Sequence, residues 1–193
     1  MQYHDVRFVT SAARAEQWPD ESFPEAVFAG RSNAGKSTLI NALLNRRAIA
    51  YTGKTPGRTR LLNFFAVDEK MMFTDAPGYG YATSDAASAA AFGRLMEPYF
   101  RYRRNLKALV LVLDARRCAG EDDVSMCDYA RAMHLAVVPV LTKIDKLSRS
   151  ACLASLKKNA AALKMPESAF LPVSALKKQG LDDVWIRLNQ ILL

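Results

Sequence analysis

Short apolar runs alternate along the chain with longer stretches in which apolar residues recur every three or four positions. The runs typical of buried strands are centred on Val27, Phe64, Met72, Leu111, Val138 and Leu171. The stretches with helical spacing lie near Leu43, Leu95, Tyr129, Leu156 and Ile186. Strands that alternate with helices favour a mostly parallel sheet with helices on both faces. The pattern therefore predicts a three-layer α/β fold.

The chain has 193 residues, of which 50% are hydrophobic and 24% are charged. This length and composition are typical of one globular domain with enough apolar material for a core. No linker or repeat interrupts the pattern, so we expect residues 1–193 to form a single domain. Residues 1–22 precede the first predicted strand and are expected to be a short lead-in.

The apolar runs are short and the beginning of the sequence is polar. The run Ala108–Leu113 is far shorter than the roughly 20 residues that cross a bilayer, and residues 1–5 lack a signal-peptide pattern. We therefore expect a cytoplasmic protein without a membrane span. The three cysteines, which lack metal-site spacing, are expected to be reduced structural thiols: Cys118, Cys127 and Cys152.

The most specific motif lies at residues 30–38, Gly-Arg-Ser-Asn-Ala-Gly-Lys-Ser-Thr, which contain the Gly-x-x-x-x-Gly-Lys-Ser pattern of a phosphate-binding P-loop. Gly30 and Gly35 allow backbone N–H groups to approach phosphates closely. Lys36 is expected to reach the terminal phosphates, and Ser37 to offer its hydroxyl to Mg²⁺. The alternative is an ordinary turn that carries a lysine, but a predicted strand before it and a predicted helix after it favour the P-loop.

A second motif, Asp75-Ala76-Pro77-Gly78, follows the apolar run at residues 71–74. A carboxylate at this strand end could hold Mg²⁺ through water, and the N–H of Gly78 could face a γ-phosphate. Alone this signal is weak, because Asp, Pro and Gly are common in turns.

The third motif, Thr142-Lys143-Ile144-Asp145, indicates which base is bound. Guanine presents two donors on one edge, which the carboxylate of Asp145 can accept together, while Lys143 lies along the ring. Adenine would place a lone pair against that carboxylate, which a site built for hydrogen bonding rejects. The alternative is a solvated charged turn. A fourth motif, Pro172-Val173-Ser174-Ala175, lies downstream, and the backbone N–H of Ala175 could donate to guanine O6.

Taken in order, these motifs resemble those of a translation-factor-class GTPase. More narrowly, the chain resembles the bacterial EngB family, also called YihA or YsxC, within the TrmE-Era-EngA-EngB-septin-like superfamily. The resemblance runs through nearly the whole chain and is strongest at residues 30–41, 55–65 and 75–82. It implies a Ras-like P-loop GTPase fold that binds GTP or GDP with Mg²⁺. Ala76 departs from the Leu more common there in the family.

The resemblance implies Mg²⁺ ligands at Ser37, Asp75 and Thr59, and phosphate chemistry at Lys36, Asn33, Thr59 and Gly78. Thr52 and Thr55 are alternatives to Thr59 in the same switch loop. The residues expected to contact the nucleotide are Gly30, Arg31, Ser32, Asn33, Ala34, Gly35, Lys36, Ser37, Thr38, Gly57, Arg58, Thr59, Arg60, Leu61, Asp75, Ala76, Pro77, Gly78, Thr142, Lys143, Ile144, Asp145, Val173, Ser174 and Ala175.

Catalysis departs from the Ras pattern, in which a Gln soon after Asp-x-x-Gly positions the attacking water. This chain has Tyr79 there, with no Gln or His nearby, so we predict slow intrinsic hydrolysis of GTP. In related GTPases an Asn at the position of Asn33 helps to hold K⁺, which neutralises phosphate charge. The alternative is that Asn33 hydrogen-bonds a switch loop.

The net charge of +8 and the pI near 9.5 favour a polyanionic partner. The family resemblance implies a monomeric, nucleotide-dependent switch in large ribosomal subunit assembly, needed for normal cell division and septation. The alternatives are a septin-like structural protein at the division site and a P-loop kinase. Candidate RNA contacts, each of which could instead be a solvated or core residue, are Arg46, Arg47, Tyr99, Phe100, Arg101, Tyr102, Arg103, Arg104, Lys107, Lys177 and Lys178.

Overall fold

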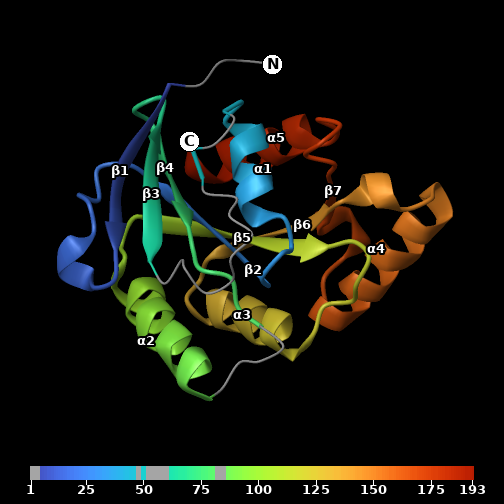
Figure 1. The fold of residues 1–193 in the computed structure, drawn as a ribbon, viewed down its shortest axis with the longest axis horizontal. Coiled ribbons are helices and arrows are strands. Elements are labelled where there is room, and N and C mark those ends of the chain that lie inside the picture. Colours follow the sequence, from blue (N-terminus) through green and yellow to red (C-terminus); the bar gives the residue numbers. More distant parts are fainter. Residues whose placement is uncertain (1–4, 47–48, 51–60, 81–85) are drawn as a thin grey trace.

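The computed structural model describes residues 5–46, 49–50, 61–80 and 86–193. Within these ranges the six predicted strands and five predicted helices occur in the predicted order, and one further strand precedes them (Figure 1). The strands are β1 (Val6–Ala12), β2 (Glu25–Gly30), β3 (Leu62–Val67), β4 (Met71–Asp75), β5 (Leu106–Asp114), β6 (Ala136–Thr142) and β7 (Leu171–Pro172). The helices are α1 (Lys36–Leu43), α2 (Ala86–Tyr102), α3 (Glu121–Ala132), α4 (Arg149–Leu163) and α5 (Leu181–Leu192), with short 3-10 turns at Ala15–Gln17, Ile144–Lys146 and Glu167–Ala169.

In these residues the strands form one sheet in the order β1-β3-β4-β2-β5-β6-β7. Strand β2 is parallel to both of its neighbours, β4 and β5, whereas β3 runs antiparallel to β4 and to β1. After β2 the chain builds the β3 side of the sheet, and it then crosses back to β5 on the other side. The carboxyl end of β2 is therefore a topological switch point, where ligands bind in such sheets.

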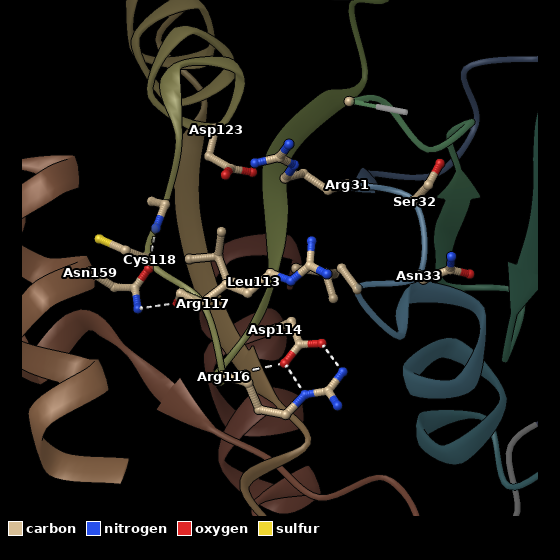
Figure 2. Close-up of a pocket in the computed structure, with 14 residues that line it drawn as sticks. Arg31, Ser32, Asn33, Leu113, Asp114, Arg116, Arg117, Cys118, Asp123 and Asn159 are labelled. Carbon is tan, nitrogen blue, oxygen red and sulfur yellow. Dashed lines mark hydrogen bonds and ion pairs between the residues drawn. The ribbon is translucent and has the colours of Figure 1, made fainter. Parts of the chain in front are cut away.

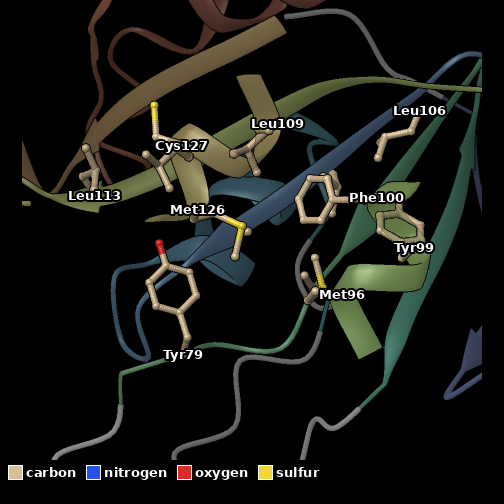
Figure 3. Close-up of a cluster of buried hydrophobic side chains, with 14 of the residues drawn as sticks. Tyr79, Met96, Tyr99, Phe100, Leu106, Leu109, Leu113, Met126 and Cys127 are labelled. Atoms are coloured by element: carbon tan, nitrogen blue, oxygen red, sulfur yellow. The ribbon is translucent and has the colours of Figure 1, made fainter. Parts of the chain in front are cut away.

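Each face of the sheet buries its own layer of apolar side chains. Along β5 the residues alternate: Leu109 and Leu111 pack under α2 and α3, while Val110 and Val112 pack under α1 and α5. Figure 3 shows part of the first layer, where Met96 and Phe100 of α2 lie near Leu109 and Met126. Because β5 is buried on both faces, its sequence is a continuous apolar run. The predicted three-layer α/β fold is confirmed.

The segment before Phe23 differs from the expected lead-in, because it contributes edge strand β1. Residues Val6–Ala12 pair antiparallel with β3, with an irregularity between Phe8 and Thr10. Most of β1 is exposed or half-buried, and Phe8 is 52% exposed. An edge strand that covers little of the core needs no apolar run, so the hydrophobic pattern gave no signal for it.

At the end of the sheet where the central strands β2 and β5 begin, a buried carboxylate binds several side chains. Glu25 and Arg103 are 0% and 1% exposed, and Arg103 Nε lies 2.8 Å from Glu25 Oε2. Glu25 also accepts hydrogen bonds from Thr74 and from the Tyr99 hydroxyl. The hypothesis that Arg103 contacts RNA is therefore wrong, because its guanidinium is buried in an ion pair with Glu25. Tyr99 and Phe100 are core residues, which was the alternative for both.

No helix in the described part of the chain is long and apolar enough to cross a membrane. Its three cysteines are free thiols, and burial raises the pKa of Cys127. Seven residues predicted to contribute to binding lie outside the described residues: Arg47 and the switch-loop residues Thr52, Thr55, Gly57, Arg58, Thr59 and Arg60.

Candidate nucleotide-binding site

The P-loop connects β2 to α1 at the switch point of the sheet. A Cβ at Gly30 would lie 2.4 Å from the carbonyl oxygen of Val112 in β5, so only glycine fits there. Gly35, which precedes the first turn of α1, has a φ of 96°, in the left-handed region that glycine adopts without strain. Asn33 also has a positive φ. This loop leads directly into the N-terminus of α1, where backbone N–H groups favour an anion.

Lys36, the first residue of α1, forms an ion pair with Asp75 at the end of β4. The two side chains are 11% and 4% exposed. The first and second predicted motifs therefore meet. A positive charge beside a helix N-terminus, with a carboxylate opposite, is the arrangement needed to hold a phosphate together with a divalent cation.

The segment that follows Asp75 is hydrogen-bonded to the P-loop. The backbone N–H of Ser32 donates to the carbonyl of Tyr79 at 2.9 Å, and the N–H of Tyr79 donates to the carbonyl of Gly30 at 3.3 Å. The hydroxyl of Tyr79 points away and donates to Asp123 of α3 at 2.8 Å. Burial, followed by the Asp123 carboxylate, raises the pKa of Tyr79 well above its ordinary value. The Tyr79 hydroxyl therefore stays protonated and donates its hydrogen bond to Asp123 inside the fold.

The third motif holds the back of the P-loop. The hydroxyl of Thr142 contacts the carbonyls of Ala34 and Leu113. Lys143 Nζ donates to the carbonyl of Asn33 at 2.5 Å and lies 2.9 Å from Asp114 Oδ2. Lys143 is consequently stretched across the loop, with its aliphatic part available to lie along a base.

Asp114, which ends β5, holds Lys143 and Arg116 together. Arg116 lies 2.7 Å from Asp114 Oδ2, and Lys143 contacts the same oxygen. Burial acts to raise the pKa of Asp114, but hydrogen bonds from Arg116 and Lys143 outweigh it and place the pKa well below the usual carboxyl range. We had not predicted Asp114 as a site residue. A signal existed, because it is a carboxylate at the same strand end as the other motifs.

The third and fourth motifs meet at Asp145, whose side chain is 6% exposed. Ser174 Oγ donates to Asp145 Oδ1 at 2.7 Å, and this hydrogen bond lowers the pKa of Asp145. The N–H of Ile144 donates to the carbonyl of Val173 at 3.4 Å. One oxygen of Asp145 is therefore oriented by Ser174, which fixes the direction in which the carboxylate can receive donors.

A cavity of about 190 Å³ lies beside the P-loop (Figure 2). Its walls include Arg31 to Ala34 of the loop and the residues around Arg117 after β5. Figure 2 shows Arg31 extended toward Asp123 of α3. The guanidinium lies so close to Gly80 and Gly120 that a Cβ at either position would approach it within 2.9 and 3.0 Å. A phosphate contact from Arg31 would accordingly be made by its backbone.

The structure thus brings together the described members of all four motifs. Leu61 lies beyond them, directly before β3, and is 36% exposed. For a divalent cation, the described part of the chain offers no cluster of three or more His, Cys, Asp or Glu side chains. It does offer hard oxygen donors at Ser37 and Asp75, next to the loop. This fits Mg²⁺, which binds through one or two protein oxygens plus phosphates and water.

Comparisons with known proteins agree with this geometry. Residues 25–143 match the family model described as 50S ribosome-binding GTPase. The chain is 40% identical over 192 residues to a probable GTP-binding protein EngB of Syntrophotalea carbinolica, covering 100% of this chain and 93% of the relative. It is 43% identical over 194 residues to the corresponding Geobacter metallireducens protein, with coverages of 100% and 94%.

Solved structures agree on the fold. A crystal structure of a probable GTP-binding protein EngB aligns with a TM-score of 0.71 at 23% identity, covering 86% of this chain and 97% of that one. A crystal structure of Era with MgGDPNP and a fragment of 16S ribosomal RNA aligns at 0.66 and 23% identity, covering 88% and 57%. With these sequence relatives matched over 93% and 94% of their length and the P-loop in place, the chain belongs to the EngB family of GTP-binding proteins, within the GTPase superfamily.

Proposed function

We propose that this protein is a GTP-hydrolysing switch that acts in assembly of the large ribosomal subunit and that normal cell division and septation depend on it. The observation that carries the guanine-nucleotide part is the pair of contacts from Thr142 and Lys143 to the P-loop. They hold the predicted base-reading residue, Asp145, at a fixed position relative to the phosphate cradle. The ribosomal part is supported by the description of the matching family model and by the net charge of +8.

In this proposal each motif meets one part of the nucleotide. Gly30 to Thr38 cradle the phosphates, with Lys36 exchanging Asp75 for the terminal phosphates. Asp145 accepts the N1–H and amino donors of guanine, Lys143 lies along the ring, and Ala175 donates to O6. Ser37, Asp75 and Thr59 would hold Mg²⁺, which when bound neutralises phosphate charge.

Slow intrinsic hydrolysis follows in this proposal from the position of Tyr79. Its hydroxyl is held by Asp123, and the side chain is 8% exposed, so it cannot orient a water at the phosphates. K⁺ at Asn33 is our candidate for the missing positive charge. We expect faster hydrolysis in KCl than in NaCl at matched ionic strength. The Asn33→Gly variant should lose this difference, since glycine tolerates the φ of 65° and only the side chain is removed. Equal rates in both salts contradict the role of K⁺.

The partner is tested by co-sedimentation of the protein with purified large ribosomal subunits at physiological salt. We expect more protein to pellet with a non-hydrolysable GTP analogue than with GDP. In this proposal the protein that does not pellet is a monomer, and in the cell it is cytoplasmic. The Lys36→Ala variant is the control, because it should lose the nucleotide dependence. Equal or absent pelleting contradicts the proposal, and GTP-dependent light scattering by the protein alone would favour the septin-like alternative.

A further inference from the structure

The outward face of α4 carries several cations and no carboxylate. Arg149, Lys157 and Lys158 are exposed, and the exposed Lys164 forms the C-cap. No Asp or Glu occurs in Arg149–Leu163. Arg149 and Lys157 are eight residues apart, which places them about 80° apart around the helix and about 12 Å apart along its axis, and Lys158 lies about 100° beyond Lys157. The exposed cations therefore spread over about half of the helix circumference, with no acidic side chain of the helix among them.

Nothing inside the described structure neutralises this surface. None of these four cations forms an ion pair with another described residue, whereas Arg7, Arg116 and Arg131 each pair with a neighbouring carboxylate. Glu167 is the next acidic residue along the chain, beyond the end of the helix. Unpaired like charges do not stabilise a helix. Ion pairing within the described residues thus does not account for these cations, and the surface is complementary to an extended polyanion.

Helix α4 is also hydrogen-bonded to the segment that follows β5, at the end of the sheet where the nucleotide motifs lie. Helix α4 begins four residues after Asp145, with Ser148 as its N-cap. In its third turn, Asn159 accepts the N–H of Ala119 at 2.8 Å and donates to the carbonyl of Arg117 at 3.2 Å, a contact drawn in Figure 2. Arg117 is exposed and lies in the wall of the cavity beside the P-loop. A partner on α4 would therefore sit next to the nucleotide end of the sheet.

The other basic stretch, residues 101–107, has a different setting. Arg103 is buried against Glu25, and the N–H of Arg104 donates to Glu21 at 3.2 Å. Arg101 lies over the ring of its neighbour Tyr102, with 5.6 Å between the guanidinium carbon and the ring centroid. The stretch lies where β5 begins, at the end of the sheet opposite the nucleotide motifs. Its acidic neighbours and its position both favour α4 as the docking face.

We propose that the face of α4 formed by Arg149, Lys157, Lys158 and Lys164, extended by Arg117, docks on the phosphate backbone of RNA. This inference rests on the proposed ribosomal function and specifies the surface that performs it. An acidic membrane is a poorer fit, because an interfacial helix needs a wide apolar face. The apolar side of α4 is turned into the core at Ala160 and Leu163, and Leu153 is its one large exposed apolar side chain among the described residues.

The test compares two variants with the same loss of charge. The α4 variant is Arg149→Gln/Lys157→Gln/Lys158→Gln, and the control is Arg101→Gln/Arg104→Gln/Lys107→Gln. Binding to purified large subunits is measured with the GTP analogue over a range of KCl concentrations. For the α4 variant we expect affinity to fall about tenfold or more, and the slope of log affinity against log salt to become shallower by about two. The control variant should bind within about twofold of the wild type.

Two further measurements keep the result specific. GTP affinity and thermal unfolding of the α4 variant should equal those of the wild type, because its changed side chains are exposed and lie outside the nucleotide motifs. A charge-preserving variant, Arg149→Lys/Lys157→Arg/Lys158→Arg, should restore subunit binding. Restoration supports contact with phosphates through charge.

Three outcomes overturn the inference alone: equal losses in the α4 variant and the control, a loss confined to the control, or phosphatidylglycerol vesicles that compete with RNA for the wild type. In each of these cases wild-type binding to subunits still depends on the nucleotide. If the wild type itself shows no nucleotide-dependent binding, the proposed function fails instead.

Discussion

The two ends of the parallel strands both contain buried or partly buried ion pairs, and the ends differ in how completely the chain encloses these pairs. At the end where β2 begins, Glu25 and Arg103 are 0% and 1% exposed, and further side chains saturate the carboxylate. At the opposite end, Lys36 and Lys143 are 11% and 29% exposed, and each pairs with a carboxylate at the end of a strand, Asp75 of β4 and Asp114 of β5. A fully buried pair such as Glu25–Arg103, here called the sealed pair, can only support the fold. A partly exposed pair beside the P-loop such as Lys36–Asp75, here called the mouth pair, can exchange one partner for a ligand.

The sharpest way to break this comparison is to remove one member of the sealed pair. Arg103→Met keeps the unbranched side chain but leaves the Glu25 carboxylate buried without its counter-charge. We expect the free energy of unfolding in urea to fall by about 3–5 kcal/mol. Arg104→Met, at the exposed neighbouring position, is the control and should change it by less than about 0.5 kcal/mol. Similar small effects from both substitutions would show that the sealed pair does not support the fold.

At the open end, Asp145→Asn tests the reading of the base. Asn can still accept the hydrogen bond from Ser174, but it cannot receive both guanine donors as a carboxylate does. We expect GTP affinity to fall by more than about a hundredfold and xanthosine triphosphate, whose ring edge replaces a donor with an acceptor, to bind better than GTP. Titration calorimetry with both nucleotides measures this. Unchanged affinity for GTP would remove Asp145 from the site.

Lys36→Ala tests whether the mouth pair serves the ligand more than the fold. We expect GTP affinity to fall about 30-fold, equivalent to about 2 kcal/mol, because one charge-assisted contact to phosphate is lost. The loss of unfolding free energy should be smaller than for Arg103→Met. Lys70→Ala, which removes an exposed lysine after β3, is the matched control. A stability loss as large as that of Arg103→Met would contradict the proposed difference between the ends.

The smallest expected effect concerns Asp114, whose pKa is lowered in the folded protein. A carboxyl with a lowered pKa stabilises the fold above its ordinary pKa of 3.8, and this stabilisation is lost as the pH falls below that value. We expect Asp114→Asn to lower the free energy of unfolding by about 1–2 kcal/mol at pH 7. The difference from the wild type should shrink as the pH is reduced from 5 toward 3. A constant difference across that range would contradict the role of the ionised carboxylate.

Much of the architecture could be predicted because both faces of the sheet are covered. The strands β2, β5 and β6 had to be apolar runs, and the helices that cover them had to repeat at helical spacing. Strand β1 escaped prediction because an edge strand is only partly buried. Arg103 was misassigned for a related reason, since a basic run in the sequence does not show which of its side chains points inward to a distant carboxylate such as Glu25.

The site divides in the same way. The sequence by itself determined that a P-loop, a strand-end Asp and the residues Thr142 to Asp145 follow one another in the order of a guanine-nucleotide site, because each motif is a local requirement for particular side chains. Only the tertiary structure decided that Asp114 secures Lys143, that Asp123 takes the hydroxyl of Tyr79, and that the cations of α4 stay unpaired within the described chain. Those contacts join residues far apart in sequence, and the register of the sheet, which no local pattern encodes, brings them together.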